Sequence, residues 1–138
     1  MALLVFSLVF HRFSASWMSF PPLEDLNLEP RLPYADDSFD VCTLALSVQY
    51  LTRPLEVFQE LRRVLRPGGM AVVAFSHRAF IEKAVKLWAE APEDGEGHAH
   101  VVCRYFQHGP QQGWHMLHTV DVSPRHGDPV WLVTAVKS

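Results

Sequence analysis

The sequence predicts an α/β domain whose parallel strands are followed by an antiparallel pair. Two nearly continuous apolar runs, Phe39–Leu46 and Met70–Phe75, have the length of strands covered on both faces, as in a parallel sheet. The segment between them, Pro54–Arg66, repeats its apolar residues at spacings of three and four, the period of a helix. Trp114–Val122 and Pro129–Lys137 are typical of two further strands joined by a turn. This order indicates an α/β sheet with an antiparallel edge.

Length and composition predict one soluble globular domain. The 138 residues suffice for a single core, and 49% hydrophobic with 20% charged residues is typical of a folded soluble protein. A net charge of −3 offers no one-signed basic face, so we expect no nucleic-acid partner. No stretch reaches the roughly 18 apolar residues that cross a bilayer. We therefore expect no membrane span and, by default, an intracellular, cytoplasmic location. Cys42 and Cys103 are predicted to be reduced structural thiols, with one disulfide as the alternative.

The N-terminal segment differs from the rest of the chain. Leu3–Phe10 is its most apolar run, and no acidic residue precedes Glu24. The pattern fits a signal peptide poorly, because Arg12 follows the apolar core; a transit peptide and a buried strand followed by a loop are the alternatives. Organellar targeting therefore stays open. We expect a divergent leader or substitute strand over residues 1–22 and one domain over residues 23–138.

The helix over Pro54–Arg66 has defined ends. Proline suits a first turn, where no N–H is needed, and Pro67-Gly68-Gly69 is predicted to stop the helix. A second helix is predicted over Ala79–Ala91, and Asp94-Gly95-Glu96-Gly97 is predicted to break its pattern. Residues 98–108 fit a short helix or a strand.

An ordered set of short motifs lies between Leu32 and Phe75. Along the chain these are Leu32-Pro33-Tyr34, Asp37-Ser38-Phe39-Asp40, Glu60, Arg63-Val64-Leu65-Arg66 and Pro67-Gly68-Gly69. The set resembles the second half of the type 11 methyltransferase family, a class I S-adenosylmethionine-dependent family, and the resemblance extends over residues 23–138. It implies a partial Rossmann-like, doubly wound sheet with an antiparallel C-terminal hairpin. It also implies methyl transfer from S-adenosylmethionine to a small-molecule or lipid-like acceptor.

The resemblance implies where the cofactor would bind. Asp25 and Leu26 match the end of the family's third strand, near the adenine, while Ala45 and Leu46 match the end of the fourth strand, near the methionine part. Because open α/β sheets bind ligands at the carboxyl ends of their strands, we expect both pairs at one edge of the sheet.

For the other polar residues the sequence indicates a function less clearly. The sequence assigns no catalytic residue; Tyr50 and His77 follow strand ends, where an acceptor would be deprotonated, and stay open candidates. Asp36, Asp37 and Asp40 are interpreted as turn and motif residues rather than as a carboxylate site. The histidines lack the spacing of a zinc finger, so we expect no metal site.

One feature of the family is missing. No G-x-G-x-G loop follows any strand, and His11–Ser19 contains no glycine. The alternative function is therefore a catalytically inactive, truncated methyltransferase-like module that acts through protein interaction. In the family the first strand lies beside the fourth, so its loss would leave Phe39–Leu46 as an open apolar edge. We expect Leu3–Phe10 to fill this slot, or a second chain to do so as a homo-oligomer or partner protein.

Overall fold

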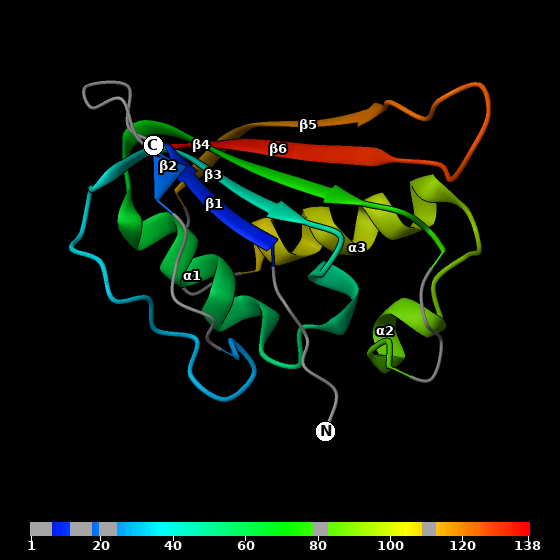
Figure 1. Cartoon of the computed structure of the whole chain (residues 1–138), viewed down its shortest axis with the longest axis horizontal. Helices are drawn as coiled ribbons and strands as arrows, with labels where there is room; N and C mark the ends of the chain where they lie inside the picture. The colour runs from blue at the N-terminus through cyan, green and yellow to red at the C-terminus, as the bar shows by residue number, and fades with distance from the viewer. Residues whose placement is uncertain (1–6, 12–17, 20–24, 79–82, 109–112) are drawn as a thin grey trace.

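A computed structural model describes residues 7–11, 18–19, 25–78, 83–108 and 113–138. These residues form one six-stranded sheet with the strand order β2-β1-β3-β4-β6-β5 and helices beside it (Figure 1). In the described part no helix is long and apolar enough to cross a membrane. The elements are β1 (Ser7–His11), β2 (Met18–Ser19), β3 (Phe39–Ala45), η1 (Val48–Tyr50), α1 (Pro54–Val64), β4 (Leu65–Phe75), α2 (Lys86–Ala89), α3 (Gly95–Gln107), β5 (Trp114–Asp121) and β6 (Trp131–Lys137).

The centre of the sheet is the parallel pair β3 and β4, which α1 connects. Val41 pairs with Met70 and Ala45 with Ala74, so both strands end at the same edge. β6 then pairs antiparallel with β4, and β5 pairs antiparallel with β6. The predicted α/β class with an antiparallel C-terminal hairpin is confirmed.

β1 occupies the slot beside β3, where the sequence left an apolar edge open. Ser7 pairs with Ala45 and His11 with Val41, so β1 runs antiparallel to β3. The part of Leu3–Phe10 that the structure describes therefore fills the expected slot. Because of this direction, β1 ends at His11 beside the amino end of β3, opposite the edge where β3 and β4 end.

The helices cover one face of the sheet. α1 packs on β4, and α3 packs on β5 and β6 (Figure 1). Leu44, Val73 and Val133 face the helices and are 0% exposed, whereas alternate residues such as Val72 and Thr134 are half-buried. The expectation that the apolar strands are covered on both faces is thus wrong for the described helices. One face of the sheet therefore has no described helix on it, although the strands carry apolar residues on both faces.

Edge-to-face aromatic contacts hold the helical layer together. Phe58 of α1 is 1% exposed, and its ring centroid lies 5.5 Å from that of Tyr105 and 4.7 Å from that of Phe106. Phe106 in turn contacts Trp114 of β5 at 5.0 Å. Such pairs are favourable beyond the area they bury, so they fix α3 against both α1 and the hairpin.

The first helix ends earlier than predicted. Leu65 is extended, fully buried and paired with Phe39, so α1 stops at Val64 and β4 begins at once. Pro67-Gly68-Gly69 lies within β4 at a register shift, with Gly68 at φ +79°, a conformation suited to glycine. The motif therefore forms an irregularity in the strand rather than a separate loop.

The region after β4 also differs from the prediction. Of the predicted helix over Ala79–Ala91, residues 79–82 lie outside the described residues and only α2 is helical in the remainder. The helical pattern is interrupted before Asp94, as predicted, but the glycines belong to the first turn of α3. Asp94 caps α3, its Oδ1 accepting a hydrogen bond from Gly97 N at 2.6 Å. A cap of this kind stabilises a helix start even where glycines weaken it, and residues 98–107 are helical.

The two cysteines are free thiols in different environments. Cys42 is 1% exposed in β3, and burial raises its pKa, whereas Cys103 is partly exposed on α3. We expect a disulfide reagent such as DTNB to modify one thiol in the native chain and both in guanidinium, because the thiolate is the reactive form. Cys103→Ser is expected to abolish the native reaction; unchanged labelling of that variant would contradict the buried position of Cys42.

Candidate functional site

The carboxyl ends of β3 and β4 lie side by side. The Leu46 N–H donates a hydrogen bond to the carbonyl of Ala74 at 2.8 Å, which ties the two strand ends together. Leu46 has φ +52°, a left-handed conformation that is uncommon outside glycine, and it is 57% exposed. Ala45 and Leu46 therefore lie at the edge where the sequence placed them.

Asn27 brings the other two predicted residues to the same region. Its Nδ2 donates to the carbonyl of Tyr50 at 3.0 Å, and its Oδ1 accepts from the Thr52 N–H at 2.8 Å. These bonds fix the loop that contains Asp25 and Leu26 against the segment that follows β3. Asn27 had no predicted role; its amide is both donor and acceptor, but only the fold identifies its partners.

Asp25 and Leu26 differ in what they can offer a ligand. One oxygen of the exposed Asp25 carboxylate accepts a hydrogen bond from Asn27 N at 2.9 Å, and the Asp25 carbonyl accepts from Leu28 N and Glu29 N. The Leu26 side chain is 3% exposed and belongs to the core. Asp25 can thus meet a ligand through its carboxylate, and Leu26 only through its backbone.

Two buried polar atoms without partners follow Leu46. Ser47 is 2% and Gln49 3% exposed, and neither Ser47 Oγ nor Gln49 Oε1 has a hydrogen-bond partner in the described part of the chain. Buried polar atoms are nearly always paired in native proteins. The pair therefore indicates a place where a bound molecule or water completes the structure, directly after the end of β3.

A cavity of about 430 Å³ lies beside the end of β4. His77, which is half-buried, and Trp88, which is 2% exposed, both line it. His77 Nδ1 and Trp88 Nε1 have no partner among the described residues. The Gln49 carbonyl accepts a hydrogen bond from Val85 N at 3.0 Å, which connects the wall of this cavity to the segment after β3. The cavity thus lies at the end of β4, the strand that neighbours β3.

The two open candidates for proton transfer differ in position. Tyr50 is 8% exposed in the core, and its carbonyl is bound by Asn27. His77 lines the cavity with a free ring nitrogen, as described above. Of the two, His77 has the geometry to contact a bound molecule.

At the carboxyl edge of the sheet, the residues near the end of β3 fit S-adenosylmethionine. The exposed Asp25 carboxylate can accept hydrogen bonds from a nucleoside, and the exposed Leu46 side chain offers an apolar contact at the same edge. The strand in the slot beside β3 does not lead into a glycine-rich loop at this edge, because β1 runs antiparallel to β3 and ends at the opposite edge. The residues present thus fit the side of the ligand that lies over β3.

The three aspartates of the 32–40 segment are structural at the opposite edge. Asp36 pairs with Arg63 at 2.8 Å, Asp37 with Lys137 at 2.7 Å, and Asp40 with Arg66. Each carboxylate thus has its own cation, which confirms the interpretation of these residues as part of the motif rather than as a carboxylate site. Within the described ranges, no group of three His, Cys, Asp or Glu side chains is placed to hold a metal ion.

Arg63 is the centre of a clamp at that edge. Its guanidinium donates to the Glu60 carboxylate at 2.8 Å and to the carbonyls of Tyr34 and Leu32 at 2.7 and 3.0 Å. Burial alone would raise the pKa of Glu60, but hydrogen bonds from Arg63 and from Leu32 N outweigh it and lower the pKa. The same bonds raise the pKa of Arg63. The Glu60-x-x-Arg63 motif therefore holds the 32–36 segment on α1.

The central part of the chain is similar to a known protein family. Residues 14–73 match the family profile described as a methyltransferase domain. The ubiquinone/menaquinone biosynthesis C-methyltransferase UbiE of Roseobacter denitrificans is 43% identical over 61 residues, which are 42% of this chain and 24% of that protein. The chain thus matches less than a quarter of that relative's length.

Solved structures with the same fold include two methyltransferases. An S-adenosylmethionine-dependent methyltransferase from Aquifex aeolicus superposes with a TM-score of 0.54 at 17% identity, covering 83% of this chain and 53% of that one. A methyltransferase solved in complex with the Trm112 activator of Haloferax volcanii gives a TM-score of 0.58 at 16% identity, with 83% and 59% covered. At such identities the likeness shows the fold, which is the Rossmann-like fold of class I methyltransferases.

Proposed function

We propose that this chain, whose residues 14–73 match the methyltransferase-domain profile, transfers a methyl group from S-adenosylmethionine to a small-molecule acceptor. The observation behind the proposal is the carboxyl edge of the sheet. Buried, unpartnered polar atoms of Ser47 and Gln49 follow the end of β3 there, and a cavity lies at the end of the neighbouring strand β4. Ligands of open α/β sheets bind at this edge.

The donor would be held by Asp25, Leu26, Ala45 and Leu46. The Asp25 carboxylate is exposed on a loop that Asn27 fixes, and the backbone of Leu26 is next to it. Ala45 and Leu46 end β3 beside the donor. S-adenosylmethionine supplies an activated methyl group, so the protein's task is to orient donor and acceptor and to exclude water.

The acceptor would occupy the cavity at the end of β4. Its volume of about 430 Å³ is that of a small-molecule site. Trp88 and His98 form part of its wall and stack at 4.4 Å between ring centroids. His77 Nδ1 lies in the same wall and could accept a proton from an acceptor hydroxyl or carbon acid. In this proposal the acceptor is a small or lipid-like molecule, and His77 accepts its proton.

A second candidate is an inactive module that acts through protein interaction. It is favoured by the sheet face opposite the helices, where Val72 and Ala74 are half-buried and no described helix packs. It is also favoured by the antiparallel β1, which cannot present a glycine-rich loop at the carboxyl edge. This candidate predicts a chain that folds, does not bind the donor, and associates with a second chain.

Calorimetric titration with S-adenosylmethionine and S-adenosylhomocysteine tests the first candidate. We expect one saturable site per chain, weakened about tenfold by Asp25→Ala because a charged hydrogen-bond partner is lost. Glu90→Ala removes an exposed carboxylate directly after α2, which pairs with the exposed Lys86, and serves as the matched control. If a folded chain does not bind S-adenosylmethionine at millimolar concentration, the proposed methyltransferase activity is wrong. Light scattering would then test the second candidate, because it measures the mass of the protein in solution and so shows whether the chain associates with a second chain.

A further inference from the structure

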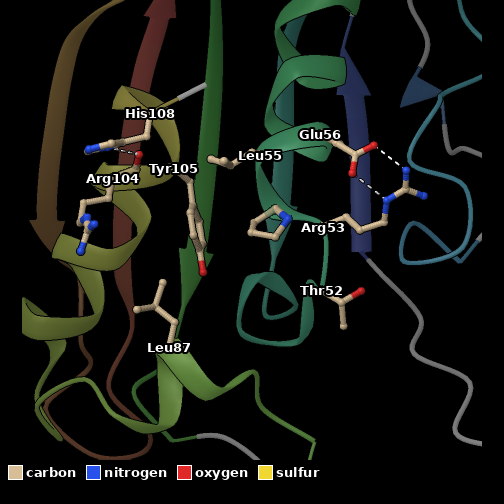
Figure 2. Close-up of a pocket in the computed structure, with 9 residues that line it drawn as sticks. Thr52, Arg53, Leu55, Glu56, Leu87, Arg104, Tyr105 and His108 are labelled. Carbon is tan, nitrogen blue, oxygen red and sulfur yellow. Dashed lines mark hydrogen bonds and ion pairs between the residues drawn. The ribbon is translucent and has the colours of Figure 1, made fainter. Parts of the chain in front are cut away.

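A separate cavity of about 530 Å³ lies between α1, α2 and α3 (Figure 2). It shares no lining residue with the cavity at the carboxyl edge. We propose that it binds a small carboxylic acid with an apolar body. The proposal is independent of the methyl-transfer function, because the groups that support it belong to the helical layer.

The walls of this cavity are apolar and open to solvent. Leu55 of α1 is 39% exposed and Leu87 of α2 is 44% exposed, and both line the cavity together with the ring of Tyr105. Figure 2 shows them on three different helices around one space. An apolar molecule bound there would remove two exposed leucines from water, which is favourable by the area buried.

A tyrosine hydroxyl from α3 points into the cavity. Tyr105 is 5% exposed, and its hydroxyl makes no hydrogen bond to any described residue. In Figure 2 the hydroxyl lies on the side of Leu87, inside the space that the other labelled residues surround. Burial raises the pKa of Tyr105, so the phenol keeps its proton at neutral pH. The hydroxyl is therefore a hydrogen-bond donor available to a ligand.

The charges around the cavity favour an anion. Arg53 and Glu56 neutralise each other through two hydrogen bonds of 2.8 and 2.5 Å. Arg104 makes no ion pair in the described part of the chain, which leaves one uncompensated positive charge on the lining. His108 adds no opposing charge, since its Nδ1 contacts the Arg104 carbonyl at 3.0 Å.

The first turn of α1 adds to this preference. The residue that begins it, Arg53, makes no side-chain capping bond, and the next residue, Pro54, has no N–H. The N–H groups of Leu55 and Glu56 are thus the free donors of the helix start, and both residues line the cavity. Free N–H groups and the helix dipole attract a carboxylate. Tyr105, which belongs to another helix, lines the same space with its hydroxyl.

Binding of 2-naphthoate tests the proposal, since this probe combines an apolar ring system with one carboxylate. We expect saturable binding followed by backbone amide shifts in two-dimensional NMR, with the largest shifts at residues 52–56, 87 and 104–108. The uncharged 2-naphthalenemethanol is expected to bind at least tenfold more weakly. Tyr105→Phe keeps the ring and removes only the hydroxyl, and is expected to weaken naphthoate about tenfold, the loss of one hydrogen bond to a charged group.

Arg104→Gln is expected to weaken naphthoate by a similar factor, while Arg125→Gln, an exposed cation on the β5–β6 loop, serves as its control. Failure to saturate at millimolar probe would overturn the proposal. So would equal affinities of the wild type, Tyr105→Phe and Arg104→Gln, or shifts confined to residues 46–49 and 76–78. S-adenosylmethionine titration of the same variants separates the two proposals, because none of these substitutions touches the carboxyl edge.

Discussion

Arg63→Met is expected to destabilise the chain by about 3 kcal/mol, the usual cost of removing one member of a buried ion pair. The Arg63 side chain is 19% exposed and the Glu60 side chain 14%. Methionine keeps the length and apolar stem of arginine but leaves the Glu60 carboxylate and two carbonyls without their donor. The free energy of unfolding in urea, measured by circular dichroism, gives the effect.

Two further variants define what Arg63 contributes. Lys86→Met removes an exposed cation, 87% accessible and 3.6 Å from Glu90, and is expected to change stability by less than about 0.5 kcal/mol. Arg63→Met combined with Glu60→Met is expected to recover part of the loss, because no charge is then left buried. A double variant as unstable as the sum of the single variants would contradict the clamp.

The effect of Arg63→Met is also expected to depend on pH. The pKa of Glu60 is lowered in the folded state, so its stabilising contribution is fully present above its unfolded pKa of about 4.3 and is lost as the pH falls through the lowered folded value. Wild type therefore loses more stability in acid than the variant, and the difference between them narrows below about pH 4. A constant difference from pH 7 to pH 3 would show that Glu60 is not the partner.

Val9→Pro is expected to cost about 3 kcal/mol or more, because proline removes a ladder hydrogen bond in the middle of a sheet. Val9 pairs with Thr43 at the centre of β1, between β2 and β3. Loss of β1 would expose the edge of β3, and open edges of apolar strands associate. We therefore expect a lower melting temperature together with oligomers in light scattering.

Val9→Thr is the matched control, since threonine is a β-branched isostere that keeps the N–H. It is expected to remain monomeric and close to wild type in the melting temperature. If Val9→Pro behaves as Val9→Thr does, β1 does not stabilise the sheet. The slot beside β3 would then be filled by another strand or chain.

The sequence by itself determined the local elements and one structural motif. The apolar runs gave β3, β4 and the hairpin of β5 and β6 because their spacing reflects burial, and Pro54 marked the start of α1. The motif also indicated a structural role for Asp36, Asp37 and Asp40, each of which forms an ion pair. The positions of Ala45 and Leu46 followed from strand ends, which a pattern locates to within a residue or two.

Only the tertiary structure decided the direction of β1, the one-sided helical layer and the convergence of the cavity walls. Backbone hydrogen bonds form equally well in parallel and antiparallel ladders, so an apolar strand such as Ser7–His11 carries no local signal for its direction. The sequence pattern at residues 98–108 fits a helix and a strand equally well for a related reason. The Asp94 cap and the packing of Tyr105 and Phe106 on Phe58 decide for the helix α3. Contacts between residues far apart in sequence decide these features, and spacing along the chain does not encode them.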